Sequence, residues 1–132
     1  MWQWAVLGLL AVVPAPTATA TFGGESFGRQ RAMTCRWFSN FENSRFDRCT
    51  AGGSDVLGRG EAASVACTGK LCDALDAEAR RVAHWRSLEP VWGSFTVRIV
   101  GRVALTPHTP RYRGDGTRTV LVERLLSVSR TP

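Results

Sequence analysis

Apolar and polar residues alternate along several stretches of this chain, which is typical of strands with one buried face. Residues 33–37 carry apolar side chains at every second position, so a strand is expected to begin near Arg31. After a bend at 40–43, a second strand is expected over about residues 44–49. A glycine-rich break follows, and residues 62–67 then predict a short third strand.

The apolar period lengthens to three or four residues after this third strand. The apolar residues with this spacing are Leu71, Leu75, Ala79 and Val82. They predict one amphipathic helix. Thr68 is expected to cap its N-terminus, and Asp76 is expected to pair with Arg80 on the helix surface. Pro90 prevents the helix from continuing further.

Alternation with a period of two returns after the helix. Residues 95–105 predict a long strand, in which Gly101 allows a bend. The connection over residues 106–116 ends in a strong turn sequence. Residues 118–128 predict the last strand, and the pair at 123–124 marks a bulge or the point at which this strand leaves the core.

The expected elements are therefore three strands, one helix and two strands, in a single domain over residues 31–130. The fold class is mainly β with one helix (α+β), and a chain of 132 residues is too short for a TIM barrel. This order resembles the OB-fold, a small five-stranded barrel whose helix lies between the third and fourth strands. The resemblance covers residues 31–129 and implies an OB-like barrel. A split α+β sandwich has the same order of elements and remains an alternative.

The N-terminus differs from the rest of the chain, because its first 20 residues contain no Asp, Glu, Lys or Arg. An apolar run over residues 4–13 and a following A-x-A sequence predict a signal peptide over residues 1–20, cleaved after Ala20. Residues 21–30 are glycine-rich and are expected to be a flexible spacer. The apolar run is too short to cross a membrane. The mature protein is therefore expected to be periplasmic or secreted, with no membrane span.

Cysteine usage agrees with export. The chain has four cysteines, an even number in a small protein, which predicts two disulfides. Local pairing of Cys35 with Cys49 and of Cys67 with Cys72 is the preferred connectivity, and the crossed pairings remain open. No C-x-x-C motif occurs and both histidines are distant in sequence from every cysteine, so no metal site or cofactor is expected.

A second resemblance lies near the C-terminus. Residues 112–123 read Tyr-Arg-Gly-Asp-Gly-Thr-Arg-Thr-Val-Leu-Val-Glu. This stretch resembles the C-terminal part of small exported proteins of unknown function from Gram-negative bacteria. The resemblance implies export and brings no activity with it.

Two short motifs that have known roles in other proteins occur here by chance, as the composition of the chain allows. Residues 24–28 match the G-x-S-x-G nucleophile elbow. The motif begins just after the predicted cleavage site, which leaves no room for the strand that must precede such an elbow. Residues 113–115 spell Arg-Gly-Asp, which we interpret as turn chemistry in a chain rich in arginine and glycine.

The histidines and the central tryptophans also have structural interpretations. His84 and His108 have no nucleophile and orienting carboxylate arranged around them in the sequence. We therefore expect no catalytic residue, and a small hydrolase is the least favoured function. Trp85 and Trp92 bracket Pro90 and are expected to plug the end of the barrel under the helix rather than to form a ligand cage.

Charge is the strongest functional signal. The formal net charge is +6, and residues 94–132 contain seven arginines against two acidic residues. We expect one face to gather the arginines of the last two strands and their connection: Arg98, Arg102, Arg111, Arg113, Arg118 and Arg124. Such a face would bind an anion, such as the phosphate of lipopolysaccharide or of nucleic acid.

Two functions follow from these patterns. The first is an exported, non-catalytic module that binds a partner or supports the envelope, in which the arginines only provide solubility and protect strand edges. The alternative is specific binding of a polyanion through the basic strand face. An anionic envelope component is a more natural partner than nucleic acid, because the periplasm contains little nucleic acid.

Overall fold

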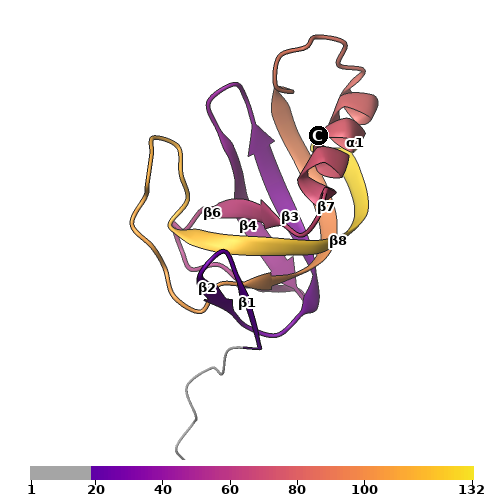
Figure 1. The fold of residues 1–132 in the computed structure, drawn as a ribbon. Helices are drawn as coiled ribbons and strands as arrows, with labels where there is room; N and C mark the ends of the chain where they lie inside the picture. Colours follow the sequence, from indigo (N-terminus) through magenta and orange to yellow (C-terminus); the bar gives the residue numbers. More distant parts are fainter. Residues whose placement is uncertain (1–18) are drawn as a thin grey trace, which may run out of the picture.

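The fold is described from a computed structural model, which places residues 19–132 (Figure 1). The chain is mainly β with one helix, an α+β class, as predicted. Most of the predicted signal peptide, residues 1–18, lies outside the described residues. The elements are β1 (Ala20–Phe22), β2 (Glu25–Phe27), β3 (Arg31–Ser39), β4 (Ser44–Ala51), β5 (Ser54–Asp55), β6 (Ala63–Cys67), α1 (Leu71–Ala83), β7 (Gly93–Val103) and β8 (Arg118–Arg130).

The larger sheet has the strand order β3-β7-β8-β6-β4-β5, and β3 also pairs with β4. The pairings of β3, β7, β8, β6 and β4 therefore close into a ring. Neighbouring strands in the ring are antiparallel, except that β6 and β8 are parallel. The helix lies between β6 and β7 in the chain and packs against β8 and β6. It covers one end of the strands (Figure 1). No helix within residues 19–132 is long and apolar enough to cross a membrane.

The core lies inside this ring, where the strands turn every second side chain inward. In β3 the inward positions Met33, Cys35 and Trp37 are at most 4% exposed, which confirms the alternation predicted there. The strongly buried residues around them on the other elements are Phe46, Cys49, Leu75, Ala79, Phe95, Val97, Ile99, Val120 and Val122. One continuous apolar cluster therefore joins the strands of the ring to the helix.

Both disulfides have the local connectivity that was preferred from the sequence. Cys35 and Cys49 are direct partners across β3 and β4, with their Cα atoms 4.0 Å apart. Cys67, at the end of β6, is bonded to Cys72 in the first turn of α1. The four cysteines of the chain are thus all paired.

The helix follows its predicted period but not its predicted cap. The N-cap residue is Lys70, which makes no side-chain capping bond, so the prediction for Thr68 was wrong. The backbone N–H of Thr68 instead donates to the carbonyl of Val122 at 3.0 Å, because Thr68 still continues the pairing of β6 with β8. The ion pair between Asp76 and Arg80 is present at 2.6 Å.

The expected role of Trp92 as a core plug was also wrong. Val91 is fully buried, whereas Trp92 is 50% exposed. Successive side chains of extended backbone point to opposite sides, so a buried Val91 turns its neighbour outward. Trp85 packs against the core, and its indole N–H donates to the carbonyl of Glu89 at 3.0 Å.

Two irregularities bend the long β7–β8 ladder. Leu126 and Glu123 each lack an opposite residue in β7, because the register shifts beside them. The bulge at Glu123 confirms the bulge interpretation of residues 123–124. Gly101 lies at this second shift, and a Cβ atom there would collide with the carbonyl oxygen of Leu121. The predicted bend at Gly101 is therefore a place where two backbones approach closely.

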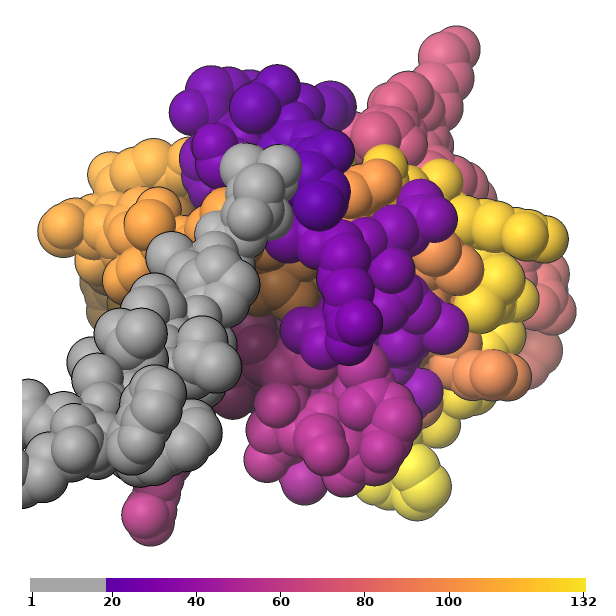
Figure 2. All heavy atoms as spheres, turned by 90° about the horizontal axis from the view of Figure 1, so that it is seen from below, coloured from indigo at the N-terminus to yellow at the C-terminus, as the bar shows by residue number. Residues whose placement is uncertain are grey.

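Residues within the segment expected to be a spacer form the β1–β2 hairpin. Phe27 at the end of the hairpin is 1% exposed and packs with Ala104 and Leu121 in a small second cluster. In Figure 2 the hairpin and β3 lie between the connection over residues 106–116, in orange, and β8, in yellow.

One buried carboxylate holds the connection over residues 106–116 to β6. The Asp115 side chain has no exposed surface. It accepts a hydrogen bond from the Ser64 hydroxyl at 2.5 Å and from the backbone N–H and Nε of Arg111, both at 2.9 Å. Burial opposes ionisation of Asp115, but the hydrogen bonds from Arg111 and Ser64 outweigh it and hold the pKa well below its usual range.

We expect Gly101→Ala to destabilise the protein by about 2 kcal/mol, because β7 and β8 must separate to admit a methyl group. Urea unfolding monitored by circular dichroism measures this loss. Gly28→Ala is the matched control, since a Cβ there meets Leu105 at an ordinary 3.5 Å. Equal stability of the two variants would contradict the close approach at Gly101.

We expect Asp115→Asn to lower the free energy of unfolding at pH 7 by roughly 2 kcal/mol, because it removes a buried charge that accepts several hydrogen bonds. The folded-state pKa is depressed, so the contribution of Asp115 is complete above its unfolded pKa, near 4, and is lost as the pH falls toward the folded-state value. The difference between the two proteins should therefore be largest above about pH 5 and shrink toward pH 2. Urea unfolding at several pH values measures it, and a difference that does not change with pH would be inconsistent with this role.

Candidate functional site

The outward side of β3 and β4 carries two arginines directly opposite each other. Arg36 of β3 is the Cα partner of Arg48 of β4, and both residues are exposed. The adjacent pair in the register is Cys35 with Cys49, which points inward. Like charges directly opposite each other on one face of a sheet are destabilising. The fold therefore keeps an unfavourable pair in a fixed register.

Two further arginines continue this basic surface across the ring. Arg98 of β7 lies opposite Thr34 of β3, and Arg124 of β8 lies opposite Val100 of β7. Both arginines are exposed. Four neighbouring strands, β4, β3, β7 and β8, thus contribute to a surface that we call the arginine face: Arg36, Arg48, Arg98 and Arg124.

Hydroxyl side chains occupy the positions between these arginines. They are Thr34, Thr50, Thr96, Ser127 and Ser129. Neither β3 nor β7 contains an acidic residue. Guanidinium groups and hydroxyls together donate several hydrogen bonds to an anionic oxygen. The arginine face therefore combines positive charge with neutral donors over several strands.

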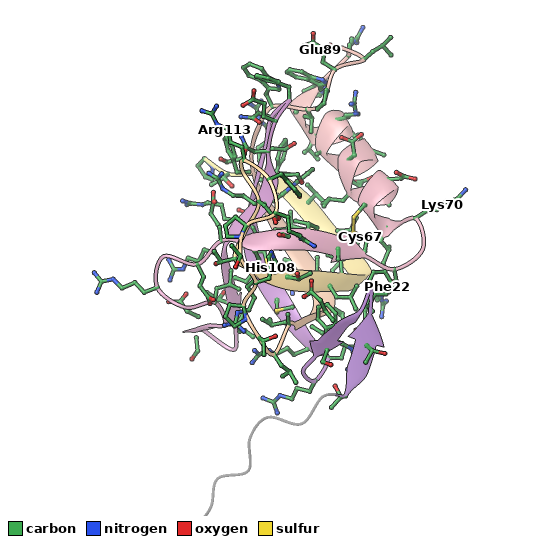
Figure 3. The ribbon with its side chains drawn as sticks, turned by 60° about the vertical axis from the view of Figure 1, so that its left-hand side comes forward. Phe22, Cys67, Lys70, Glu89, His108 and Arg113 are labelled. Carbon is green, nitrogen blue, oxygen red and sulfur yellow. A yellow bond between two sulfur atoms is a disulfide. The ribbon has the colours of Figure 1, made fainter. Side chains whose placement is uncertain are left out.

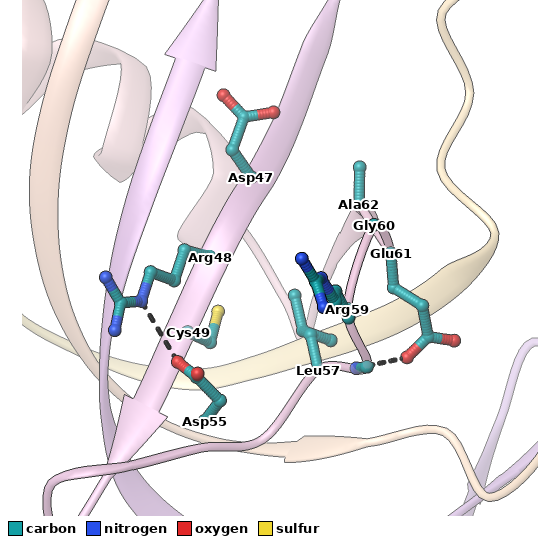
Figure 4. A pocket seen from close by; sticks show the side chains of 10 residues that line it. Asp47, Arg48, Cys49, Asp55, Leu57, Arg59, Gly60, Glu61 and Ala62 are labelled. Atoms are coloured by element: carbon teal, nitrogen blue, oxygen red, sulfur yellow. Dashed lines mark hydrogen bonds and ion pairs between the residues drawn. The ribbon is translucent and has the colours of Figure 1, made fainter.

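Few carboxylates neutralise this surface. Arg48 pairs with Asp55 at 3.0 Å, as the close view of β4 shows (Figure 4). Both side chains of this pair are more than half exposed, so water screens it and it contributes little energy. Within residues 19–132, no ion pair involves Arg36, Arg98 or Arg124.

Two shallow hollows lie on the arginine face. One has a volume of about 280 Å³ and lies between Arg36 and Arg48. The other, of about 220 Å³, is lined by Arg98. Thr34 and Thr50 line both, so the two hollows are adjacent. Open depressions of this size suit groups along a polymer rather than one enclosed small molecule.

A larger hollow, of about 690 Å³, lies on the other side of Arg48 and is drawn in Figure 4. Its charged lining is mixed in sign: Asp47, Arg48, Asp55, Arg59 and Glu61. This mixture gives it no clear preference for anions. Compared with this hollow, the two smaller ones are the better candidates for anion binding.

Of the arginines expected to share one face, Arg98 and Arg124 lie on the arginine face. Arg102 is largely buried and pairs with Glu123 at 2.6 Å. Arg111 binds the buried Asp115, as described above. Arg113 is exposed on the connection over residues 106–116 and is not part of a strand (Figure 3). The arginines that were expected to share one face are thus divided, since some are exposed and others are held in structural ion pairs.

Arg118 also has a structural partner. It pairs with Glu61 at 3.0 Å and donates to the carbonyl of Ala104 at 2.9 Å. The backbone N–H of Gly58 and the guanidinium of Arg118 together lower the pKa of Glu61 against the effect of burial. This network ties the loop before β6 to the start of β8.

Sequence reasoning missed Arg36 and Arg48, although a signal for them existed. In an antiparallel pair, the residue after one partner lies opposite the residue before the other. Once Cys35 is paired with Cys49 across two strands, Arg36 must lie opposite Arg48. The preferred disulfide and the two predicted strands were therefore enough to predict that Arg36 lies opposite Arg48.

The histidines do not form a nucleophilic site within the described part of the chain. His84 is exposed in the left-handed conformation that ends α1, with φ of 51°. His108 Nε2 lies 3.4 Å from Asp115, but the Ser64 hydroxyl donates to this same carboxylate rather than to a histidine. A serine activated by a histidine base requires a different arrangement. Residues 19–132 also contain no group of three or more potential metal ligands.

Comparisons of this chain with protein-family models, with curated proteins and with solved structures gave no match. The geometry of the arginine face is therefore the basis for a functional assignment.

Proposed function

We propose that this chain is an exported, non-catalytic binding domain that holds an anionic polymer of the cell envelope on its arginine face. The observation that carries the proposal is the placement of Arg36 directly opposite Arg48 on an exposed surface. The two like charges repel each other in the free protein, although water and the Arg48–Asp55 pair weaken this repulsion. An anionic group bound between them changes this repulsion into two attractions.

The surrounding residues support binding over simple solubility. A soluble strand face needs polar residues, and the threonines and serines of this surface already supply them. The arginines add a concentrated positive charge, which attracts polyanions and releases their counterions on binding. Arginine also donates two parallel hydrogen bonds to a phosphate or carboxylate group.

The proposed architecture is an OB-like barrel. The closed order of pairings, the parallel contact of β6 with β8 and the position of α1 between β6 and β7 support it. Domains of this architecture bind extended polymers on the outside of their strands. The arginine face is such a surface and spans four strands.

Export is part of the proposal. Two disulfides suggest an oxidising environment, since such bonds are rare in the cytosol. The apolar leader of the sequence supports a periplasmic or secreted location. In these compartments the abundant polyanions are glycans and lipids that carry phosphate or carboxylate groups. An anionic envelope glycan is therefore favoured over nucleic acid as the partner.

We expect affinity for heparin, a sulfated glycan, to fall steeply with salt concentration, because counterion release drives binding. Replacing both Arg36 and Arg98 with alanine should weaken binding about tenfold at low salt and flatten the salt dependence. Isothermal titration calorimetry at several salt concentrations measures both quantities.

Arg81→Ala combined with Arg86→Ala is the matched control, because it removes the same charge from exposed positions at α1 and just after it. This control should keep most of the affinity. If affinity did not change with salt, or if both double variants lost it equally, the arginine face would not be the binding site.

We expect the mature protein from its native host to begin at Thr21 and to contain two disulfides. Mass spectrometry should detect no free thiol before reduction and four alkylated cysteines after it. An intact Met1, or four thiols before reduction, would contradict export.

A further inference from the structure

Two exposed aromatic rings stack at the end of the β3–β7 ladder. Phe41 is 60% exposed and Trp92 is 50% exposed. Their ring centroids are 5.7 Å apart and their planes are inclined by 25°. The two residues come from different connections, one after β3 and one before β7. We call this pair the aromatic shelf.

The backbone holds both rings in place. The Asn40 side-chain oxygen accepts hydrogen bonds from the backbone N–H groups of Glu42 and Asn43, at 2.8 and 2.7 Å, which fixes the turn that carries Phe41. Trp92 follows the fully buried Val91 and directly precedes β7. Large aromatic side chains held rigidly in water are typical of binding surfaces.

The aromatic shelf continues the arginine face along the same two strands. Proceeding along the ladder, Arg36 lies opposite Thr96, Phe38 lies opposite Ser94, and the last pair is Ser39 with Gly93. At about 3.3 Å per residue, the last pair lies roughly 10 Å from Arg36. The Arg45 guanidinium covers the Phe38 ring at 5.2 Å, between the two surfaces.

Charge changes sign beside the aromatic shelf. A hollow of about 380 Å³ next to Phe41 is lined by Glu42, Asn43, Ser44 and Asp76. Asp76 is already paired with Arg80 at 2.6 Å, so the negative charge of this hollow comes from Glu42. Carboxylates repel phosphate groups but accept hydrogen bonds from hydroxyls. The part of a ligand that lies here is therefore expected to be uncharged and rich in hydroxyl groups.

We infer that the polymer bound by this protein is a phosphate-bearing glycan, with a neutral sugar packed on the aromatic shelf and a neighbouring phosphate on the arginine face. This inference rests on the proposed function and specifies its substrate class. The apolar C–H face of a sugar ring packs on Trp92, and its hydroxyls donate to the Glu42 carboxylate beside Phe41. A nucleic acid fits less well, since its regularly spaced phosphates would also lie beside Glu42.

The test compares two probes with the full chain. One is a delipidated core oligosaccharide of lipopolysaccharide that retains its phosphates, and the other is inorganic polyphosphate, which has no sugar. Trp92→Ala should weaken binding of the oligosaccharide roughly fivefold and leave binding of polyphosphate unchanged. Trp92→Phe, which keeps an aromatic ring, should retain most of the affinity. Since Trp92 is half exposed, neither variant opens the core.

The outcomes separate this inference from the proposed function. If Arg36→Ala with Arg98→Ala weakens both probes and Trp92→Ala weakens neither, the proposed function holds and the sugar subsite is rejected. If Trp92→Ala weakens polyphosphate as much as oligosaccharide, the shelf does not recognise sugar. If single-stranded DNA bound more tightly than the oligosaccharide, and if this binding depended on Trp92, the partner would be a nucleic acid rather than a glycan. If the unchanged protein binds none of the probes, the proposed function fails as well.

Discussion

The covalent bond between Cys35 and Cys49 fixes the structure on which the candidate site depends. It joins two directly opposed residues of β3 and β4, and so sets the register of the pair that closes the ring of strands. A shift of one residue would turn every side chain of one strand to the opposite face. With the disulfide in place, Arg36 and Arg48 cannot relieve their repulsion by such a shift. The bond therefore keeps the two arginines opposite each other on one exposed surface.

Other arginines of the chain form ion pairs that stabilise the fold. Arg102, Arg111 and Arg118 each bind a carboxylate that is largely or fully buried. Arg102 also donates to the Thr19 hydroxyl and to the carbonyl of Gly28, and so holds the N-terminal segment to β7. Paired charges of this kind stabilise one arrangement of the chain. The arginines of the arginine face have at most an exposed partner. Position relative to a carboxylate, rather than the number of arginines, thus separates the arginines held in structural ion pairs from the exposed ones.

The sequence predicted the elements well because they depend on local periods. The alternation in β3, the helix from Leu71 and the bulge at Glu123 were all visible within a few neighbouring residues. The predictions for Thr68 and Trp92 were wrong because contacts with segments distant in sequence decide the positions of both residues. The carboxylate partners of the structural arginines could not be predicted, since a residue such as Glu61 is distant in sequence from Arg118. The arginine face depends on the register of β3 and β4. In the sequence, only the preferred Cys35–Cys49 disulfide indicated that register.

The two surfaces would recognise different parts of one ligand through different physical effects. Arginine keeps its charge across physiological pH, so the arginine face senses the charge of the ligand and the salt around it. Stacking on Phe41 and Trp92 depends on ring shape and is almost insensitive to salt. A ligand with phosphate alone gains only the first contribution, whereas a neutral sugar gains only the second. On the proposed ligand, the phosphate and the sugar would therefore be recognised separately by two surfaces that follow one pair of strands.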